Sequence, residues 1–297
     1  MRPYHAALII GCLLFAAPAL AAEITLEGTP EQGALIRGMA APGARVALDG
    51  KKLRVAPDGR FIFGFGRDAP EHATLDIVFA DGTRLHRDLV VAIRQYDIRR
   101  IDGLPPAQVS PSPEAMIRIK REQVEIDRAL AVESDNLAFE APLIWPVLGP
   151  ISGIFGSQTI MNGESRSPHY GVDVAAPAGS PVRASNAGRI VLAAPDLYFT
   201  GGTIIIDHGY GLSTTYVHLQ HMVVKRGDRV RQGQPIGEVG STGRATGPNL
   251  HWGVNWGGVR LDPALVAGPM PALNPASGDA ARASAPGAPA PSAPPSH

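Results

Sequence analysis

The sequence contains a single cysteine, Cys12, which lies in a short apolar stretch near the N-terminus. If that stretch is a signal peptide that is removed, the mature chain has no cysteine. Disulfide bonds, thiol catalysis and metal sites that use sulfur are then excluded. Aromatic residues make up only 6% of the chain, and the formal net charge is zero. A neutral chain has no global field that attracts nucleic acid, so we expect no nucleic-acid partner.

The N-terminus has the three parts of a secretory signal peptide. Arg2 supplies a positive charge, residues 6–17 form an apolar segment, and residues 19–21 offer a small-x-small cleavage site. The apolar segment is shorter than the roughly 20 residues that a membrane-spanning helix needs. A lipoprotein cleavage site at Cys12 is the alternative, but the residues after it stay apolar. We therefore expect removal of residues 1–21, export to the periplasm or cell envelope, and no transmembrane segment in the mature chain.

Residues 22–100 are expected to form a small β-sandwich. Apolar and polar residues alternate there, and Asp-Gly turns separate the runs. These turns are at 49–50, 58–59 and 81–82. Period-two runs joined by Asp-Gly turns are typical of antiparallel hairpins. His72 and His86 lie among charged residues without partners at ligand spacing, so we expect both at the surface.

Residues 101–140 are expected to be a linker with an amphipathic helix. Pro113 opens a stretch to residue 138 in which apolar residues recur among many charges, with proline in the first turn. A spacer that packs one apolar face on a neighbouring domain is the simplest role, and a lid over a downstream site is the alternative. Residues 141–268 are rich in glycine, valine and isoleucine and predict a second β domain. Alanine, proline and serine dominate residues 269–297, which predicts a disordered tail.

Three residues of the second β domain have the chemistry of a zinc site. His169 and Asp173 are four residues apart on a segment expected to be extended, where alternate side chains share a face. His251 lies on a later extended segment and can complete the set from a neighbouring strand. Between them we expect a strand that begins at 203–206 and ends at 216–219. Catalytic zinc takes three nitrogen or oxygen ligands and leaves a fourth position for water, although each of these signals alone is weak.

Several short motifs follow one another along most of residues 146–263. They are at 152–156, 168–173, 179–182, 207–211, 216–219, 227–243 and 246–251. In combination they resemble the lysostaphin-type, or LytM-like, zinc metalloendopeptidases, which cleave peptide bonds in peptidoglycan. The resemblance implies a two-sheet antiparallel β domain with the metal in a groove between loops. Many relatives carry an arginine at the position of Thr159, a departure whose effect the pattern does not define.

The resemblance also implies roles for five residues. His169, Asp173 and His251 would be the ligands of Zn²⁺, and His218 a catalytic histidine near the metal-bound water. The family's last motif is usually His-x-His, whose first histidine is the other catalytic imidazole. In this chain that position is Asn249. An amide donates a hydrogen bond to an oxyanion but does not exchange a proton near neutrality.

Other residues near these motifs have plainer interpretations. His208 belongs to an Asp-His-Gly turn that the family also carries and is not a known ligand there. His221 has the pattern of a surface residue. Trp252 and Trp256 are expected in the core or the groove wall, and Tyr170 is a candidate for the wall of the substrate cleft.

Two functions follow from these motifs. The first is a zinc metalloendopeptidase that hydrolyses peptide cross-links of peptidoglycan, with reduced activity because of Asn249. For an exported enzyme the D-alanyl-diaminopimelate cross-link is the expected bond. The alternative is a catalytically degenerate module that binds wall peptides or activates an amidase or another envelope protein. The complete ligand set favours the enzyme. A further hypothesis, based on domain order, is that the helix or the first β domain covers the cleft and keeps the enzyme latent.

Overall fold

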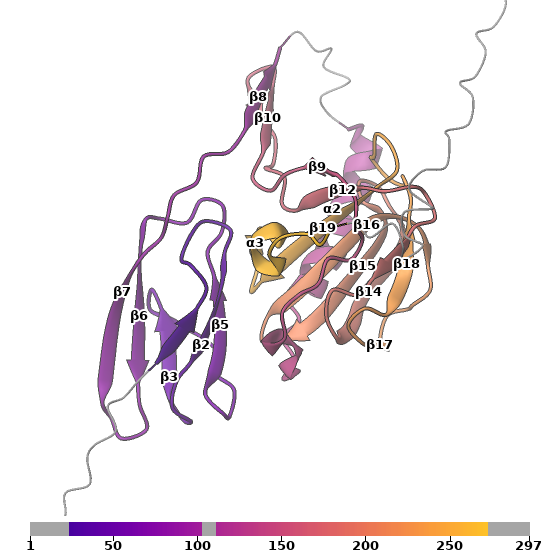
Figure 1. The fold of residues 1–297 in the computed structure, drawn as a ribbon. Helices are drawn as coiled ribbons and strands as arrows, with labels where there is room; N and C mark the ends of the chain where they lie inside the picture. The colour runs from indigo at the N-terminus through magenta and orange to yellow at the C-terminus, as the bar shows by residue number, and fades with distance from the viewer. Residues whose placement is uncertain (1–23, 103–110, 273–297) are drawn as a thin grey trace, which may run out of the picture.

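The computed structural model describes residues 24–102 and 111–272, so the expected signal peptide and most of the expected tail lie outside the described residues. The chain is mostly β, as predicted. Figure 1 shows an amino-terminal β unit on the left and a larger carboxy-terminal β unit on the right. Within the described residues no helix is both long and apolar enough to cross a membrane.

The amino-terminal unit is a sandwich of two antiparallel sheets, with strand orders β1-β2-β5 and β4-β3-β6-β7. The strands are β1 (Thr25–Glu27), β2 (Leu35–Met39), β3 (Arg45–Leu48), β4 (Lys51–Lys52), β5 (Arg60–Gly64), β6 (His72–Val78) and β7 (Arg84–Val90). The Asp-Gly turns join β3 to β4 and β6 to β7 and precede β5, as predicted. Phe61, Phe63 and Leu75 are fully buried between the sheets. His72 and His86 are exposed, as expected.

The carboxy-terminal unit is a network of ten hydrogen-bonded strands with the path β17-β14-β15-β16-β19-β12-β9. The strands are β9 (Ile151–Gly153), β12 (Val172–Ala175), β13 (Pro181–Arg183), β14 (Gly188–Leu197), β15 (Gly201–Gly209), β16 (Leu212–Met222), β17 (Arg229–Val230), β18 (Pro235–Val239), β19 (Asn249–Trp256) and β20 (Val259–Leu261). Strand β16 pairs with β19 as far as Val217 and with β18 from Leu219 onward. The antiparallel architecture is confirmed. Strand β16 joins the part of the sheet that contains β19 to the part that contains β18.

One local expectation for this unit was wrong. Residues 203–206 and 216–219 lie on two separate antiparallel strands, β15 and β16, and not on one strand. Tyr210 and Gly211 form the turn between them, with φ angles of 52° and 80°. Two successive residues with positive φ give a turn whose twist matches the flanking strands. Tyrosine seldom adopts this conformation, so only Gly211 marked the turn in the sequence.

A small third sheet connects the two units. Strand β8 (Ile98–Ile101) leaves the sandwich and pairs in parallel with β10 (Gln158–Met161), which pairs with β11 (Glu164–Ser165). These strands stand above the carboxy-terminal unit in Figure 1. Thr159 lies opposite Arg99 in this sheet.

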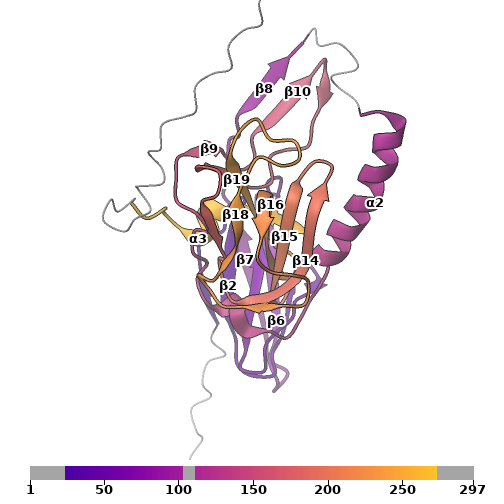
Figure 2. The same cartoon turned by 90° about the vertical axis from the view of Figure 1, so that its right-hand side faces the viewer.

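Helix α2 (Pro113–Leu130) is shorter than the helix predicted to residue 138, and a 3-10 turn, η1 (Leu137–Glu140), follows it. Ser112 caps the helix by accepting the Ala115 N–H at 3.2 Å. The helix runs alongside β14 (Figure 2) and packs Ala129 and Leu130 against a cluster that includes Ile205. Glu122 of the helix anchors the turn that joins β14 to β15, because its buried carboxylate accepts the Tyr198 N–H at 2.7 Å.

The two β units also meet through the end of the chain. Asp262 caps α3 (Pro263–Ala267) by accepting the Ala264 N–H, and it forms an ion pair with Arg94 of the first unit at 2.8 Å. Its side chain is 5% exposed, so the pairing compensates a carboxylate that is almost removed from water. The Asp-Pro dipeptide thus fixes a short helix and a contact between the units.

Candidate metal centre

The three predicted ligands converge on one face of the large sheet. Asp173 on β12 lies directly opposite His251 on β19, and His169 is in the segment that leads into β12. His169 Nε2 is 3.1 Å from Asp173 Oδ1 and 2.9 Å from His251 Nδ1. His251 Nδ1 is 2.8 Å from Asp173 Oδ1. The strand register therefore brings together residues 82 positions apart in the chain.

The donor atoms of this cluster fit a tetrahedral ion. Ligand atoms bound at 2.0–2.1 Å lie about 3.3 Å from one another in such a site, which is close to the separations observed here. His169 Nδ1 donates to the backbone oxygen of Ile154 at 3.0 Å, so Nε2 carries the lone pair that a metal needs. The side chains of His169, Asp173 and His251 remain 23%, 29% and 21% exposed. Neither β unit nor α2 seals the cluster from solvent.

The electrostatics favour the ligand form of Asp173 and His251. Burial alone would raise the pKa of the Asp173 carboxyl, but hydrogen bonds from His169 and His251 outweigh it and hold that pKa well below its usual range. Burial lowers the pKa of His251, which favours the neutral imidazole. For His169, burial alone would lower the pKa, but the hydrogen bond with Asp173 outweighs it and raises that pKa, so a metal ion has to displace a proton there. An ionised carboxylate and neutral imidazoles are the forms that bind metal ions.

Two glycines leave room for these side chains. A methyl group at Gly171 would lie 2.7 Å from His251 Nε2 and 2.5 Å from the backbone oxygen of Trp252. One at Gly153 would lie 2.3 Å from Asp173 Oδ2. Both glycines belong to the motifs singled out in the sequence, but only the folded chain shows that the side chains of Asp173 and His251 occupy the space beside them.

We expect Gly171→Ala to weaken zinc binding by about 10- to 100-fold, because the new methyl group displaces the His251 ring from its position in the cluster. Titration of the metal-free protein with zinc measures the change. Gly247→Ala is the matched control, since a methyl group there meets nothing within 4 Å. Unchanged zinc affinity in Gly171→Ala would contradict the assignment of His251 as a ligand.

His218 lies on β16 at the point where this strand changes partner. Its φ angle is 66°, a left-handed conformation that costs free energy in a residue other than glycine and that is concentrated at functional sites. Its backbone N–H donates to Thr200 O at 2.9 Å, and its Nδ1 donates to Thr242 O at 2.8 Å. The ring centre lies 6.4 Å from that of His251. The arrangement leaves Nε2 as the imidazole atom available beside the cluster.

Thr242 is a site residue to which the sequence assigned no role. Besides its carbonyl contact to His218, its hydroxyl accepts the Gly202 N–H and donates to Leu219 O, both at 2.9 Å. It therefore ties the loop after β18 to both β15 and β16, next to the point where the pairing of these strands is irregular at His218. The residue is within the motif at 227–243, yet a backbone acceptor has no sequence signature of its own.

Asn249 lies two residues before His251 on the same face of β19. Its Nδ2 donates to Gly247 O at 2.8 Å. Its Oδ1 is buried and has no hydrogen-bond partner among the described residues. The amide is thus beside the cluster, as the resemblance implied for this position, and its catalytic role stays a prediction.

His208 is a core residue, in agreement with its plainer interpretation. Its Nδ1 donates to Ala187 O at 2.7 Å, and its Nε2 accepts from the Thr214 hydroxyl at 2.8 Å. Tyr216 continues this chain of bonds to the Ser185 N–H. Burial lowers the pKa of His208 to about 4, so the ring is neutral near pH 7 and suits this network.

His221, Trp252 and Trp256 lie where the sequence predicted, and the role of Tyr170 stays a prediction. His221 is exposed on β16. Trp252 is fully buried and packs against Trp145, with ring centres 5.2 Å apart, and Trp256 is buried as well. Tyr170 is 36% exposed next to His169.

Two imidazoles and a carboxylate on an open sheet face form the donor set of a hydrolytic metal site. The sequence of residues 167–263 matches the family described as Peptidase family M23. The chain is also similar to a structure described as a putative peptidase M23 from Pseudomonas aeruginosa, with 31% identity, a TM-score of 0.64, and coverage of 81% of this chain and 96% of that one. The chain belongs to peptidase family M23.

Curated relatives with assigned activities match about a third of this chain. Peptidoglycan DD-endopeptidase ShyC of Vibrio cholerae is 42% identical over 102 residues, which are 34% of this chain and 23% of the relative. DD-carboxypeptidase/endopeptidase Mpg of Neisseria meningitidis is 44% identical over 105 residues, which are 35% of this chain and 24% of the relative. The matched region thus spans about a quarter of the length of these curated relatives.

Proposed function

We propose that this protein is a zinc metalloendopeptidase that hydrolyses peptide cross-links of peptidoglycan in the cell envelope. The convergence of His169, Asp173 and His251 on one exposed sheet face is the observation that carries the proposal. Membership of peptidase family M23 supports it, as do relatives named as endopeptidases of peptidoglycan. The signal-like residues 1–21 support export to the compartment that holds this substrate.

In this proposal His169, Asp173 and His251 hold Zn²⁺. The chemistry that the ion supplies is Lewis acidity, which polarises a scissile carbonyl and lowers the pKa of a water molecule toward about 7. The hydrogen bond from His169 to Ile154 O orients the imidazole toward the ion. The Asp173 carboxylate lowers the positive charge of the site.

In the proposed mechanism His218 transfers protons and Asn249 donates a hydrogen bond to the substrate. His218 keeps one proton at Nδ1, where Thr242 O accepts it, and can take up or release a second proton at Nε2. The Asn249 amide has a second N–H besides the one that Gly247 O accepts, and this group can donate to an oxyanion. Proton transfer therefore depends on His218 alone, which predicts a slower reaction than two imidazoles would support.

The test is to incubate the full mature chain, loaded with zinc, with purified cross-linked muropeptides. We expect cross-linked dimers to decrease and monomers to appear by chromatography, with cleavage stopped by a chelator and restored by zinc. Dimers that stay intact while the protein still binds wall peptides would contradict the proposal. That result would support the degenerate module, which binds the wall or activates an amidase.

A further inference from the structure

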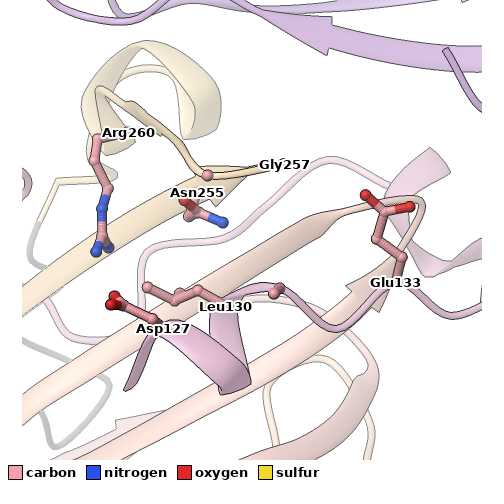
Figure 3. A pocket seen from close by; sticks show the side chains of 8 residues that line it. Asp127, Leu130, Glu133, Asn255, Gly257 and Arg260 are labelled. Carbon is pink, nitrogen blue, oxygen red and sulfur yellow. The ribbon is translucent and has the colours of Figure 1, made fainter. Parts of the chain in front are cut away.

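A cavity of about 340 Å³ lies between the end of α2 and the turn that joins β19 to β20. Asp127, Leu130 and Glu133 line it from the helix side, and Asn255 and Arg260 line it from the strands. Figure 3 shows the Arg260 guanidinium reaching toward the side on which the Asp127 carboxylate lies, with Asn255 between β20 and the helix. The proposed mechanism uses none of these side chains.

Two polar groups in this cavity have no hydrogen-bond partner in the described part of the chain. The half-buried Arg260 guanidinium makes neither a hydrogen bond nor an ion pair. Burial lowers the pKa of Arg260, and the Asp127 carboxylate opposes this effect. Asn255 is 1% exposed, and its Oδ1 is buried without a partner. Buried polar groups in folded proteins are nearly always satisfied, so both point to a ligand.

The cavity shares a sheet face with the candidate metal centre. On β19 the residues His251, Gly253 and Asn255 alternate onto one face, and Arg260 lies directly opposite Asn255 on β20. Gly253 has no side chain, so no side chain of β19 stands between the two sites on this face. At about 3.3 Å per residue, four residues of strand separate the cluster from the cavity by about 13 Å.

Helix α2 lies on this same face. Gly253 lies opposite Thr215 on β16, and Thr215 lies opposite Ile205 on β15. Leu130 of the helix packs in one cluster with Ile205. Because directly opposed residues of antiparallel strands share a face, the end of α2 borders the surface that carries His251.

The unpartnered groups specify the chemistry of the ligand. A guanidinium binds a carboxylate through two parallel hydrogen bonds, and an amide oxygen accepts an N–H. The last residue of a peptide presents both groups, an amide N–H and a free carboxylate, a few ångströms apart. Hydrogen bonds of this type, with an ionised partner, are stronger than neutral ones and give specificity.

We infer that this cavity is the subsite for the free carboxyl terminus of the wall peptide whose cross-link lies at the cluster, with Arg260 binding the carboxylate and Asn255 accepting the terminal amide N–H. The inference rests on the function proposed above. In a D-alanyl-diaminopimelate cross-link, a covalent path runs from the scissile carbonyl through the diaminopimelate side chain to a terminal D-alanine carboxylate. This path is as long as three to four extended residues. That length is about 12 Å, which matches the spacing between the two sites.

Binding of the reaction product tests the subsite without requiring cleavage. The probe is a tetrapeptide stem with diaminopimelate in third and D-alanine in last position, prepared with either a free carboxyl terminus or a carboxamide. We expect the zinc-loaded full chain to bind the free acid about 10- to 100-fold more tightly than the amide, as measured by calorimetry. Arg260→Gln should remove this difference, and Asp127→Asn should tighten binding of the acid, because it removes a repelling carboxylate.

Arg229→Gln is the control for loss of a strand arginine, because Arg229 is exposed on β17 and does not line the cavity. It should leave both affinities unchanged. Equal binding of acid and amide by the wild type, or a preference that survives in Arg260→Gln, would overturn the inference. Cleavage of cross-linked dimers by the same preparations reports separately on the proposed function. Cleavage without acid preference rejects only the subsite, and acid preference without cleavage rejects only the peptidase.

Discussion

Asp173→Asn is expected to abolish zinc binding at the cluster and to lower cleavage of cross-linked wall peptides by about 10³-fold or more. The substitution keeps the shape of the side chain but removes the only negative charge among the three donors. Two imidazoles and a neutral amide are a weak donor set for a divalent cation. Loss of the ion removes carbonyl polarisation and water activation together, which are worth several kcal/mol in the transition state.

Zinc content by elemental analysis and turnover of purified muropeptide dimers measure the two effects. Zinc should also raise the melting temperature of the wild type and leave that of Asp173→Asn unchanged, since a ligand stabilises only the state that binds it. Asp76→Asn is the matched control, because it breaks an exposed His-Asp contact, that of His86 at 2.7 Å, in the other β unit. Stoichiometric zinc in purified Asp173→Asn would remove Asp173 from the ligand set.

The parts of the fold that the sequence predicted are those encoded by local patterns. Asp-Gly turns mark hairpins because both residues tolerate the left-handed conformation that these turns need. The candidate ligands were proposed from residue type and motif, and the strand register of β12 and β19 explains how Asp173 and His251 meet. Such features depend on a few neighbouring residues and on chemistry that side chains carry with them.

The end of α2 could not be predicted in this way. The charged and apolar pattern continues beyond Leu130, but tertiary contacts draw the chain away from the helix. Ser134 O accepts hydrogen bonds from the Tyr210 N–H at 3.0 Å and from Arg54 at 3.1 Å, and Arg54 also pairs with Asp135. These partners come from both β units, so no local pattern reports them.

The latency hypothesis also changes in the light of the packing of α2. The three candidate ligands remain 21–29% exposed, so the helix does not close the site. Removal of residues 23–140 would strip Ala129 and Leu130 from Leu192 and Ile205 and expose that part of the sheet. Lost activity in such a truncation would then reflect damaged folding, whereas increased activity would still support inhibition by the N-terminal region.

Asn249→His is expected to raise the turnover number of the zinc-loaded protein by about 10²-fold. The substitution places an imidazole two residues before His251 on the same strand face, where the family's His-x-His motif has its first histidine. An imidazole exchanges protons near neutrality and an amide does not, and positioned acid-base groups contribute typically about 10²–10⁴ in rate. Zinc content should stay the same, because the three donors are untouched.

Steady-state cleavage of muropeptide dimers between pH 5 and 9 separates this explanation from others. Asn249→His should add an ionisation to the pH dependence of turnover that the wild type lacks. Asn249→Gln is the control for a longer side chain that still cannot carry a proton, and we expect no gain from it. A similar gain in both variants would assign the effect to side-chain length. No gain in Asn249→His, with zinc bound, would show that His218 already supplies all the proton transfer that the reaction uses.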